Sequence, residues 1–413
     1  MSIVLPFKAL RPQRQFAKAV AAHPYDVLSL EEAREIARNN PMSFLRVEKS
    51  EIEVPGSLDL GSDRAYRIAE ENLKDFIQKG ILFRDENPCY YIYRQKMGNH
   101  EQYGIAARFS VAEYETGKIK KHELTRRDKE LDRTNHVATV NAHTGPVFLT
   151  YMAKKSIDSM VEKVIQGEPE YDFTTDDGVA HTVWVISDSA LIEDMKAAFA
   201  SVDALYIADG HHRAAAATAV SKLKRAQNPD RAGDEAYNTM LAVIFPHDQL
   251  RIMDYNRVVK DLHGSTVSDF FKNIEKHFII SENFQEKSPG QLHEFGMYLQ
   301  GNWFKLTARP GSFNDKDSIE VLDVFILQNN LLGPILGIQD PRSDKRIDFV
   351  GGIRGMNELE KLVDSGTFAV AFSLYPPTLT QMMAVADDGK VMPPKSTWFE
   401  PKLRSGVLVN LLS

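Results

Sequence analysis

The sequence predicts an α+β fold, a mixed α/β arrangement of strands and helices. Three observations indicate it: strand-like and helix-like segments alternate between residues 147 and 245, aromatic and branched runs precede that block, and helical patterns follow it. At about 150 residues per domain, 413 residues allow two or three domains. We expect boundaries near 115 and 248, giving an N-terminal α/β region at 1–115, a core at 116–248 and a C-terminal α/β region at 249–413.

The first part is predicted to open extended, because prolines interrupt it, and to continue with two capped helices. Ser29 is a candidate N-cap for a helix that runs to Asn39. Ser62 or Asp63 starts a second helix, which ends before Gly80. Two runs rich in aromatic and branched residues then predict a strand hairpin, at 88–94 and 102–113.

The middle part alternates between strands and helices. An apolar run lies at 147–152, predicted strands lie at 181–186, 205–208 and 240–245, and predicted helices at 156–166, 191–200 and 214–225. In the last part we expect helices at 267–277, 319–330 and 357–365, then a strand at 367–374 and a proline-rich loop. The stretch 281–301 has only a weak pattern.

Composition excludes several classes of protein. A hydrophobic content of 43% with 26% charged residues is typical of a globular chain and not of a disordered or fibrous one. The net charge of −7 gives no global reason to coat DNA or an anionic membrane. Cys89 is the only cysteine, which excludes an intrachain disulfide and cysteine metal clusters. Without a secretory signal or a long apolar span, we expect a cytoplasmic protein with no membrane partner.

The sharpest local feature is the sequence Asp209-Gly210-His211-His212-Arg213, which joins an apolar strand to an alanine-rich helix. Asp209 can act as the N-cap, and Gly210 allows a tight turn and the close approach of a ligand. The open amides at a helix start attract anions. Arg213 adds a planar two-pronged donor, and the histidines add donors whose charge varies near neutral pH. The pattern predicts a phosphate site.

An alternative interpretation of this turn is a capped helix whose histidines lie on the surface, and the pattern alone does not separate the two. Zinc binding by His211 and His212 is disfavoured, because adjacent positions diverge around a helix. The glycine spacing matches neither a Walker A loop nor a dinucleotide fingerprint.

A charged segment at 119–133 is the second candidate. This segment is interpreted either as a solvated, salt-bridged helix face or as the part of the chain that carries a catalytic base beside a phosphate site. In the second case Glu123 accepts a proton, with its pKa set by burial or by basic neighbours, and Arg126, Arg127 and Arg133 hold phosphate.

A third candidate lies in the tail at 392–406, where two prolines precede Lys395, Ser396 and Thr397, and where Pro401-Lys402 and Ser405-Gly406 follow. These three residues can bind the phosphate or carboxylate of a substrate. An ordered surface loop is the competing interpretation.

Five motifs and this tail carry a family resemblance over nearly the whole chain. The motifs are Pro6–Pro12, Pro24–Val27, Asn40–Leu45, His122–Thr125 and Asp209–Arg213. Together they resemble a large bacterial and archaeal family of formerly unknown function, whose members are compared with the free-serine kinase SerK. The segment Gly210–Arg213 is similar to the phosphate-binding turn of the ParB and sulfiredoxin superfamily.

The resemblance implies a ParB/sulfiredoxin-like nucleotide-binding core with additional α/β flanking regions. SerK-type proteins transfer phosphate from ADP or ATP to free L-serine and give O-phosphoserine. Sulfiredoxins have a cysteine where His211 stands, so their chemistry is disfavoured. ParB proteins use a Gly-Glu-Arg-Arg turn with CTP and add a DNA-binding domain. The acidic balance and the lack of an evident basic recognition helix make a nucleic-acid partner improbable here.

The resemblance also assigns roles to residues. It makes Glu123 the catalytic base for the hydroxyl of a small amino acid, with His212 and Arg213 as further catalytic groups. The turn Asp209–Arg213, together with Arg126, binds the phosphates of the nucleotide. Mg²⁺ is expected, and Asp209 either caps the helix or contributes to its site, although the sequence does not identify the metal ligands.

The hypothesis from a different class is a nucleotide-binding switch without catalysis, or a ParB-like nucleotide-dependent protein. A switch uses the same turn and gives Glu123 only a structural role. The oligomeric state stays open.

Overall fold

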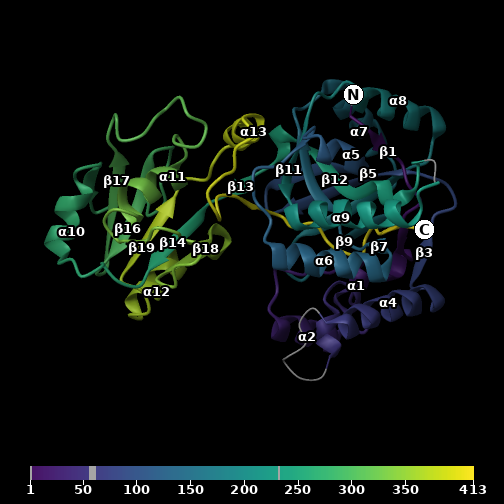
Figure 1. Cartoon of the computed structure of the whole chain (residues 1–413), viewed down its shortest axis with the longest axis horizontal. Helices are drawn as coiled ribbons and strands as arrows, with labels where there is room; N and C mark the ends of the chain where they lie inside the picture. Colours follow the sequence, from purple (N-terminus) through teal and green to yellow (C-terminus); the bar gives the residue numbers. More distant parts are fainter. Residues whose placement is uncertain (1, 55–61, 231–232) are drawn as a thin grey trace. The chain divides into compact units, whose positions relative to one another are not determined.

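The computed structural model describes residues 2–54, 62–230 and 233–413, which form two compact units (Figure 1). One unit extends to Leu250 and also includes Pro401–Ser413, and the other contains Arg251–Glu400. The mixed α/β class is confirmed by the combination of large sheets with many helices. The division into 1–115, 116–248 and 249–413 stays a prediction, as does the ParB-like character of the core.

A mixed sheet of nine described strands organises the first unit. Its order is β6 (Ile119–Lys120), β11 (Leu205–Asp209), β8 (Val147–Tyr151), β12 (Thr239–Pro246), β5 (His100–Ser110), β4 (Tyr90–Met97), β10 (Ala180–Ile186) and β9 (Tyr171–Thr174), with β1 (Val4–Leu5) on β5. The β6–β11 and β8–β12 pairs are parallel, whereas the others are antiparallel. Residues before and after 115 therefore share one sheet.

Local capping explains why the early helices form where the sequence predicts them. In α2 (Leu30–Asn39), Ser29 and Glu32 form a reciprocal capping box. In α4 (Asp63–Gln78), the side chain of Ser62 accepts the amide of Ala65. The predicted hairpin is confirmed as β4 and β5, but its second strand ends at Ser110. There the serine side chain caps α5 (Val111–Glu115), which ends the extended stretch three residues before the predicted limit.

The helix α9 (His211–Gln227) packs on β8 and β12, and buried alanines on its face allow close approach. Beside it lie α5 and α6 (Arg127–Val140), and α4 packs against α6 (Figure 1). A second pair, α7 (Lys155–Val164) and α8 (Ser189–Ala200), packs together. None of the described helices combines the length and the apolarity that crossing a bilayer requires.

Shorter elements complete the first unit. They are β2 (Leu10–Pro12), β3 (Leu82–Arg84), β7 (Ala142–His143), β21 (Asn410–Leu411), α1 (Ala17–Val20), α3 (Leu45–Glu48) and the single 3₁₀ turns η1 (Arg14–Phe16), η2 (Ser50–Glu53), η3 (Ala236–Asn238) and η4 (His247–Gln249). The C-terminal residues return to this unit, because β21 pairs with β7 and Ser405 bridges to Ala22. The guanidinium of Arg404 is buried there against Asp177 and His181.

An antiparallel sheet organises the second unit. Its order is β15 (Phe278–Glu282), β17 (Asn302–Ala308), β16 (Glu294–Leu299), β19 (Val370–Leu374), β14 (Tyr255–Val259) and β18 (Ile347–Gly351). The other elements are β13 (Ile252–Met253), β20 (Trp398–Phe399), α10 (Val267–Ile274), α11 (Asp323–Leu327), η5 (Gln328–Leu332), η6 (Gly352–Arg354), α12 (Met356–Asp364) and α13 (Leu379–Asp387).

Two expectations for the second unit need correction. The helix expected at 319–330 starts at Asp323, and its last part widens into the π-helical turn η5, where the amide of Gly333 bonds to the carbonyl of Gln328. The weakly patterned stretch contains β16, whose residues are all buried. A strand buried on both faces loses the alternation by which a strand is recognised in a sequence.

Candidate functional site

Gly210 shapes the turn between β11 and α9. It occupies the N-cap position with a φ of 87°, a left-handed conformation that suits glycine because it has no Cβ. Its carbonyl accepts the amides of Arg213 and Ala214 at 2.9 and 3.1 Å. The amides of His211 and His212 begin the helix and have no earlier carbonyl of the helix to accept them. Such a terminus attracts anions, as the sequence predicts.

The predicted N-cap role of Asp209 is wrong. Gly210 takes that position, and no side chain caps the helix. Asp209 still belongs to β11, and its carboxylate accepts the Gly210 amide, at 2.8 Å, and the ammonium of Lys402, at 2.9 Å. Partial burial works against ionisation of this carboxyl, although 44% of its side chain is exposed, and Lys402 and the amide outweigh the burial and lower its pKa to about 2.

The charged segment at 119–133 is not one continuous helix face. Residues 119–120 pair with β11 in the sheet and α6 begins only at Arg127, so Glu123 lies on the loop between them. That loop is joined to the helix start, since the amide of Arg126 donates to Nε2 of His212 at 3.0 Å. His212, one of the predicted catalytic groups, therefore holds the loop and the turn together.

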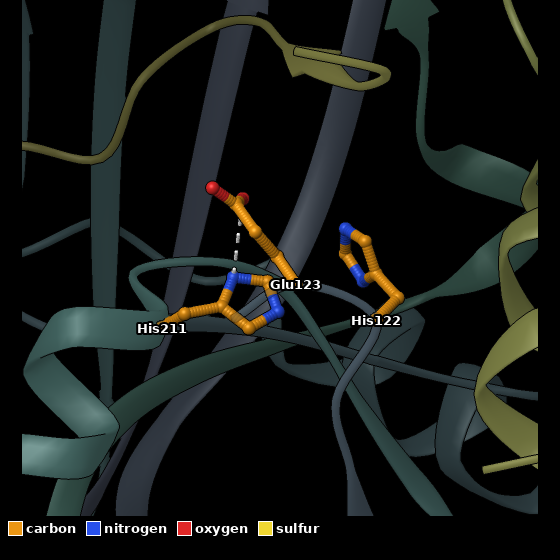
Figure 2. A group of neighbouring side chains, drawn as sticks. All are labelled: His122, Glu123 and His211. Carbon is orange, nitrogen blue, oxygen red and sulfur yellow. Dashed lines mark ion pairs between the residues drawn. The ribbon is translucent and has the colours of Figure 1, made fainter. Parts of the chain in front are cut away.

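His122, Glu123 and His211 meet beside the first turn of α9 (Figure 2). The rings of the two histidines are perpendicular, with centroids 4.6 Å apart. Nδ1 of His211 lies 3.8 Å from a carboxylate oxygen of Glu123. One possible ligand atom from each of the three residues lies within 4.8 Å of the other two. Neighbouring β6 and β11 bring these groups together, because the loop leaves one strand where α9 follows the other.

Both histidines of this group are neutral at physiological pH. Burial lowers the pKa of His122 to about 4, although a backbone hydrogen bond to Ile207 opposes the shift. Burial, reinforced by His122, also holds the pKa of His211 well below its usual range. Glu123 differs from both, since half of its side chain is exposed. The group thus combines two buried neutral imidazoles with one carboxylate that reaches solvent.

Arg213 lies on the other side of the turn. Its guanidinium donates to Glu48 at 2.9 Å, to the carbonyl of Pro146 at 2.9 Å and to Ser405 at 3.3 Å. Glu48 is buried and also accepts a hydrogen bond from Thr144. Burial opposes ionisation of Glu48, but Arg213 and its neighbours outweigh it and lower the pKa of the carboxyl. A small pocket lies along this side, lined in part by Glu48, His143 and Arg213.

The remaining predicted residues have partners of their own. The guanidinium of Arg126 is exposed and bonds to Asp128 at 2.8 Å. Lys395, Ser396 and Thr397 belong to the second unit, where the ammonium of Lys395 lies 5.5 Å from the centre of the Tyr255 ring and Ser396 donates to Pro393. The part of these three residues in substrate binding stays a prediction.

Sequence reasoning missed three residues of the site. His122 stood next to Glu123 but was given no role, Lys402 was noted in the tail without a partner, and Glu48 gave no signal at all. Two of these residues had a signal in the sequence. His122 adjoins Glu123, and Lys402 lies within the tail motif at 392–406. Glu48 lies on α3, whose sequence has no feature that links it to Arg213.

The fold and the site define a mixed α/β protein with a carboxylate and two neutral histidines at an anion-attracting helix start. Residues 4–325 match the family described as "Protein of unknown function (DUF1015)". The chain belongs to this family. Among curated proteins there is no match.

Three solved structures resemble the chain distantly. A conserved hypothetical protein from Pyrococcus furiosus is 15% identical over 74% of this chain and 95% of its own, with a TM-score of 0.36. A free serine kinase in complex with AMP is 14% identical over 72% and 91%, with a TM-score of 0.36. A mutant of that enzyme in complex with ADP is 13% identical over 72% and 92%, also with a TM-score of 0.36. At such scores, function has to be inferred from the site's own residues.

Proposed function

We propose that this protein is a nucleotide-dependent phosphotransferase whose acceptor is the hydroxyl group of a small amino acid, with ADP or ATP as donor and free L-serine as the first acceptor to test. One observation carries the proposal. The carboxylate of Glu123 lies 3.8 Å from the ring of His211, the first residue of a helix whose start attracts anions. A base and a phosphate cradle therefore adjoin each other.

The nucleotide's phosphates occupy the start of α9 in this proposal. The amides of His211 and His212 point out of the helix end, and Gly210 has no side chain to block them. The ammonium of Lys402, held by Asp209 at 2.9 Å, adds positive charge beside the turn. Phosphoryl transfer depends mainly on positioning and on neutralising charge, and this arrangement supplies both.

Glu123 acts on the acceptor. Half of its side chain is exposed, so a substrate hydroxyl can reach the carboxylate from solvent. The hydroxyl oxygen forms a bond to the terminal phosphorus, the bond from that phosphorus to the leaving phosphate oxygen breaks, and AMP or ADP departs. The carboxylate of Glu123 accepts the proton that the hydroxyl loses.

The Mg²⁺ expected from the resemblance does not fit the donor set of the site. Two of the three clustered groups are imidazoles, whereas magnesium prefers oxygen ligands. The other nearby carboxylate, Asp209, already holds Lys402. Magnesium bound to the nucleotide itself stays a prediction, and we assign it no protein ligands.

Arg213 serves as a positioning residue in this scheme. Its guanidinium is bound to Glu48, Pro146 and Ser405, so a direct contact with phosphate, which stays a prediction, requires leaving these oxygens. Through Glu48 it ties the start of α9 to α3. The same contacts keep the open amides of the helix in place.

The test is an assay of the full chain with magnesium, ADP or ATP, and L-serine, read by mass spectrometry. We expect O-phosphoserine, and we expect Glu123→Gln to lower its rate by at least about 100-fold, the contribution typical of a general base. Glu162→Gln, on the exposed side of α7, is the matched control and should retain full activity. No phosphorylated product from serine or from other hydroxy amino acids would overturn the proposal.

Calorimetry separates catalysis from a simple switch. If ADP or ATP binds equally well to the original chain and to Glu123→Gln, and neither forms product, the protein is a nucleotide-binding switch and not a transferase. If Gly210→Ala leaves nucleotide binding unchanged, the phosphate cradle has been misplaced.

A further inference from the structure

Three donors converge from two chain segments at the start of α9. His122 and Glu123 come from the loop after β6, and His211 comes from the helix (Figure 2). Their possible ligand atoms lie within 4.8 Å of one another. Two imidazoles and one carboxylate are the ligands that zinc and other first-row transition metals take in sites that keep an open position.

The two imidazoles are suited to binding a cation. Only 5% of His211 is exposed, and its Nε2 has no hydrogen-bond partner among the described residues. In Figure 2 this nitrogen lies on the side of the ring that faces His122. A buried polar atom without a partner costs free energy unless something binds it.

The spacing allows a metal to bind after small movements. Ligand atoms each about 2.1 Å from a tetrahedral ion lie roughly 3.4 Å apart. The possible ligand atoms of His122, Glu123 and His211, one from each residue, lie within 4.8 Å of one another, so they need to approach by little more than about 1 Å. Glu123 stands on a loop and is half exposed, so its carboxylate can turn inward, whereas the two histidines are held by burial.

We propose that His122, Glu123 and His211 bind one divalent transition-metal ion, with zinc as the best-matched probe, and leave one position open toward the start of α9. The metal proposal and the phosphotransferase proposal both use Glu123, and a carboxylate bound to zinc does not act as the base. The metal proposal is therefore tested by zinc binding alone, without nucleotide. His212 does not belong to the clustered group, and its Nε2 accepts the amide of Arg126. The open position faces amides that attract anions, so a phosphate or carboxylate oxygen is its natural occupant.

The test uses the full chain, stripped with a chelator and then titrated with zinc in calorimetry without nucleotide. We expect one zinc per chain, and we expect cobalt in its place to give the visible absorption of a tetrahedral nitrogen and oxygen site. Magnesium at equal concentration should not compete. Glu123→Gln and His211→Asn should each weaken zinc binding by about 100-fold or more, because even outer-shell partners contribute 10- to 100-fold.

His100→Asn is the matched control, since it changes a partly exposed histidine on β5 that does not belong to the clustered group and should leave zinc affinity unchanged. Circular dichroism confirms folding of each variant, and the half-exposed Glu123 gives a test that does not disturb the core. The proposal is overturned by less than about 0.1 zinc per chain, by unchanged affinity in Glu123→Gln, or by an equal loss in His100→Asn. Because no nucleotide is present, these results are separate from those of the kinase assay.

Discussion

The first turn of α9 has two sides that differ in almost every physical respect. On the side of His211, two neutral histidines and the half-exposed Glu123 surround a helix start that attracts anions. On the side of Arg213, the arginine, with 13% of its side chain exposed, and the buried Glu48 satisfy each other, with Thr144 and Ser405 as further partners. Residues only two positions apart in the sequence therefore have different surroundings.

The difference shows how one motif can serve both stability and function. A buried ion pair whose partners are fully hydrogen-bonded is costly to break, so Arg213 and Glu48 fix the helix start. Donors that lack protein partners, such as Nε2 of His211, keep their capacity for a ligand. Variants on the Arg213 side should therefore mainly lower stability, and variants on the His211 side should mainly lower binding.

The largest expected effect is that of Glu48→Gln. Removing the buried carboxylate leaves the largely enclosed guanidinium of Arg213 without its countercharge, which should lower the free energy of unfolding of the first unit by about 3–5 kcal/mol. Denaturant unfolding can be followed through Trp184, with Trp303 and Trp398 of the second unit replaced by Phe. The contrast between the two sides of the turn fails if Glu123→Gln, the matching change on the His211 side, lowers the free energy of unfolding by the same amount.

The next effect concerns pH. Burial, with Arg133 nearby, lowers the pKa of His136 to about 4, while Glu48, the Val47 carbonyl and Asp132 act in the opposite direction. Between pH 6.5 and 4 the unfolded chain takes up a proton that the folded histidine refuses, so stability is complete above pH 6.5 and is lost as the pH falls. The loss is on the order of 2–3 kcal/mol.

His136→Gln should remove the part of the pH dependence of stability that comes from His136, because glutamine does not titrate. Glutamine can still donate to the Val47 carbonyl, so the fold is kept. His143, whose pKa burial also lowers to about 4, stays in place and should preserve part of the slope. Unfolding midpoints of both chains at pH 7 and pH 5 measure this directly. An identical slope in the two chains would contradict the prediction.

Gly210→Ala should have a smaller effect that reaches both sides of the turn. An added Cβ would lie 3.5 Å from the Cα of Val147, an ordinary contact, so the cost comes from the backbone conformation with φ near 87°. That cost is about 1–2 kcal/mol. Gly210→Asn, which tolerates this conformation better, is the control and should lose less. Equal losses in both variants would show that space and not backbone conformation limits the turn.

Local features of the fold were predictable because their causes lie close together in the sequence. Ser29 and Ser62 start their helices through side chains that bond three residues onward, and the turn at Gly210 follows from a strand, a glycine and a run of alanines. The hairpin of β4 and β5 was also predictable, because its two strands follow each other directly in the sequence.

The partners of the site residues were not predictable in the same way. Glu48 is 165 positions from Arg213, and Lys402 is 193 positions from Asp209. His122 meets His211 only because β6 pairs in parallel with β11, which depends on the order of strands in the sheet. A single sequence carries no direct signal of that order, so it suggested the residue types of the site but not their neighbours.

The smallest expected effect on stability is that of Lys402→Met. Its ammonium lies 2.9 Å from Asp209, but almost half of that carboxylate is exposed, so the pair contributes at most about 1 kcal/mol. Nucleotide affinity should fall further, by roughly tenfold, because a cation is lost and an unpaired carboxylate then repels phosphate. Calorimetry with ADP measures the fall, and adding Asp209→Asn should restore part of the affinity by removing the repulsion. The prediction is contradicted if Lys402→Met lowers the free energy of unfolding by more than it lowers the free energy of ADP binding. Lys402 would then maintain the fold, as Glu48 and Arg213 do, and the two sides of the turn would no longer differ.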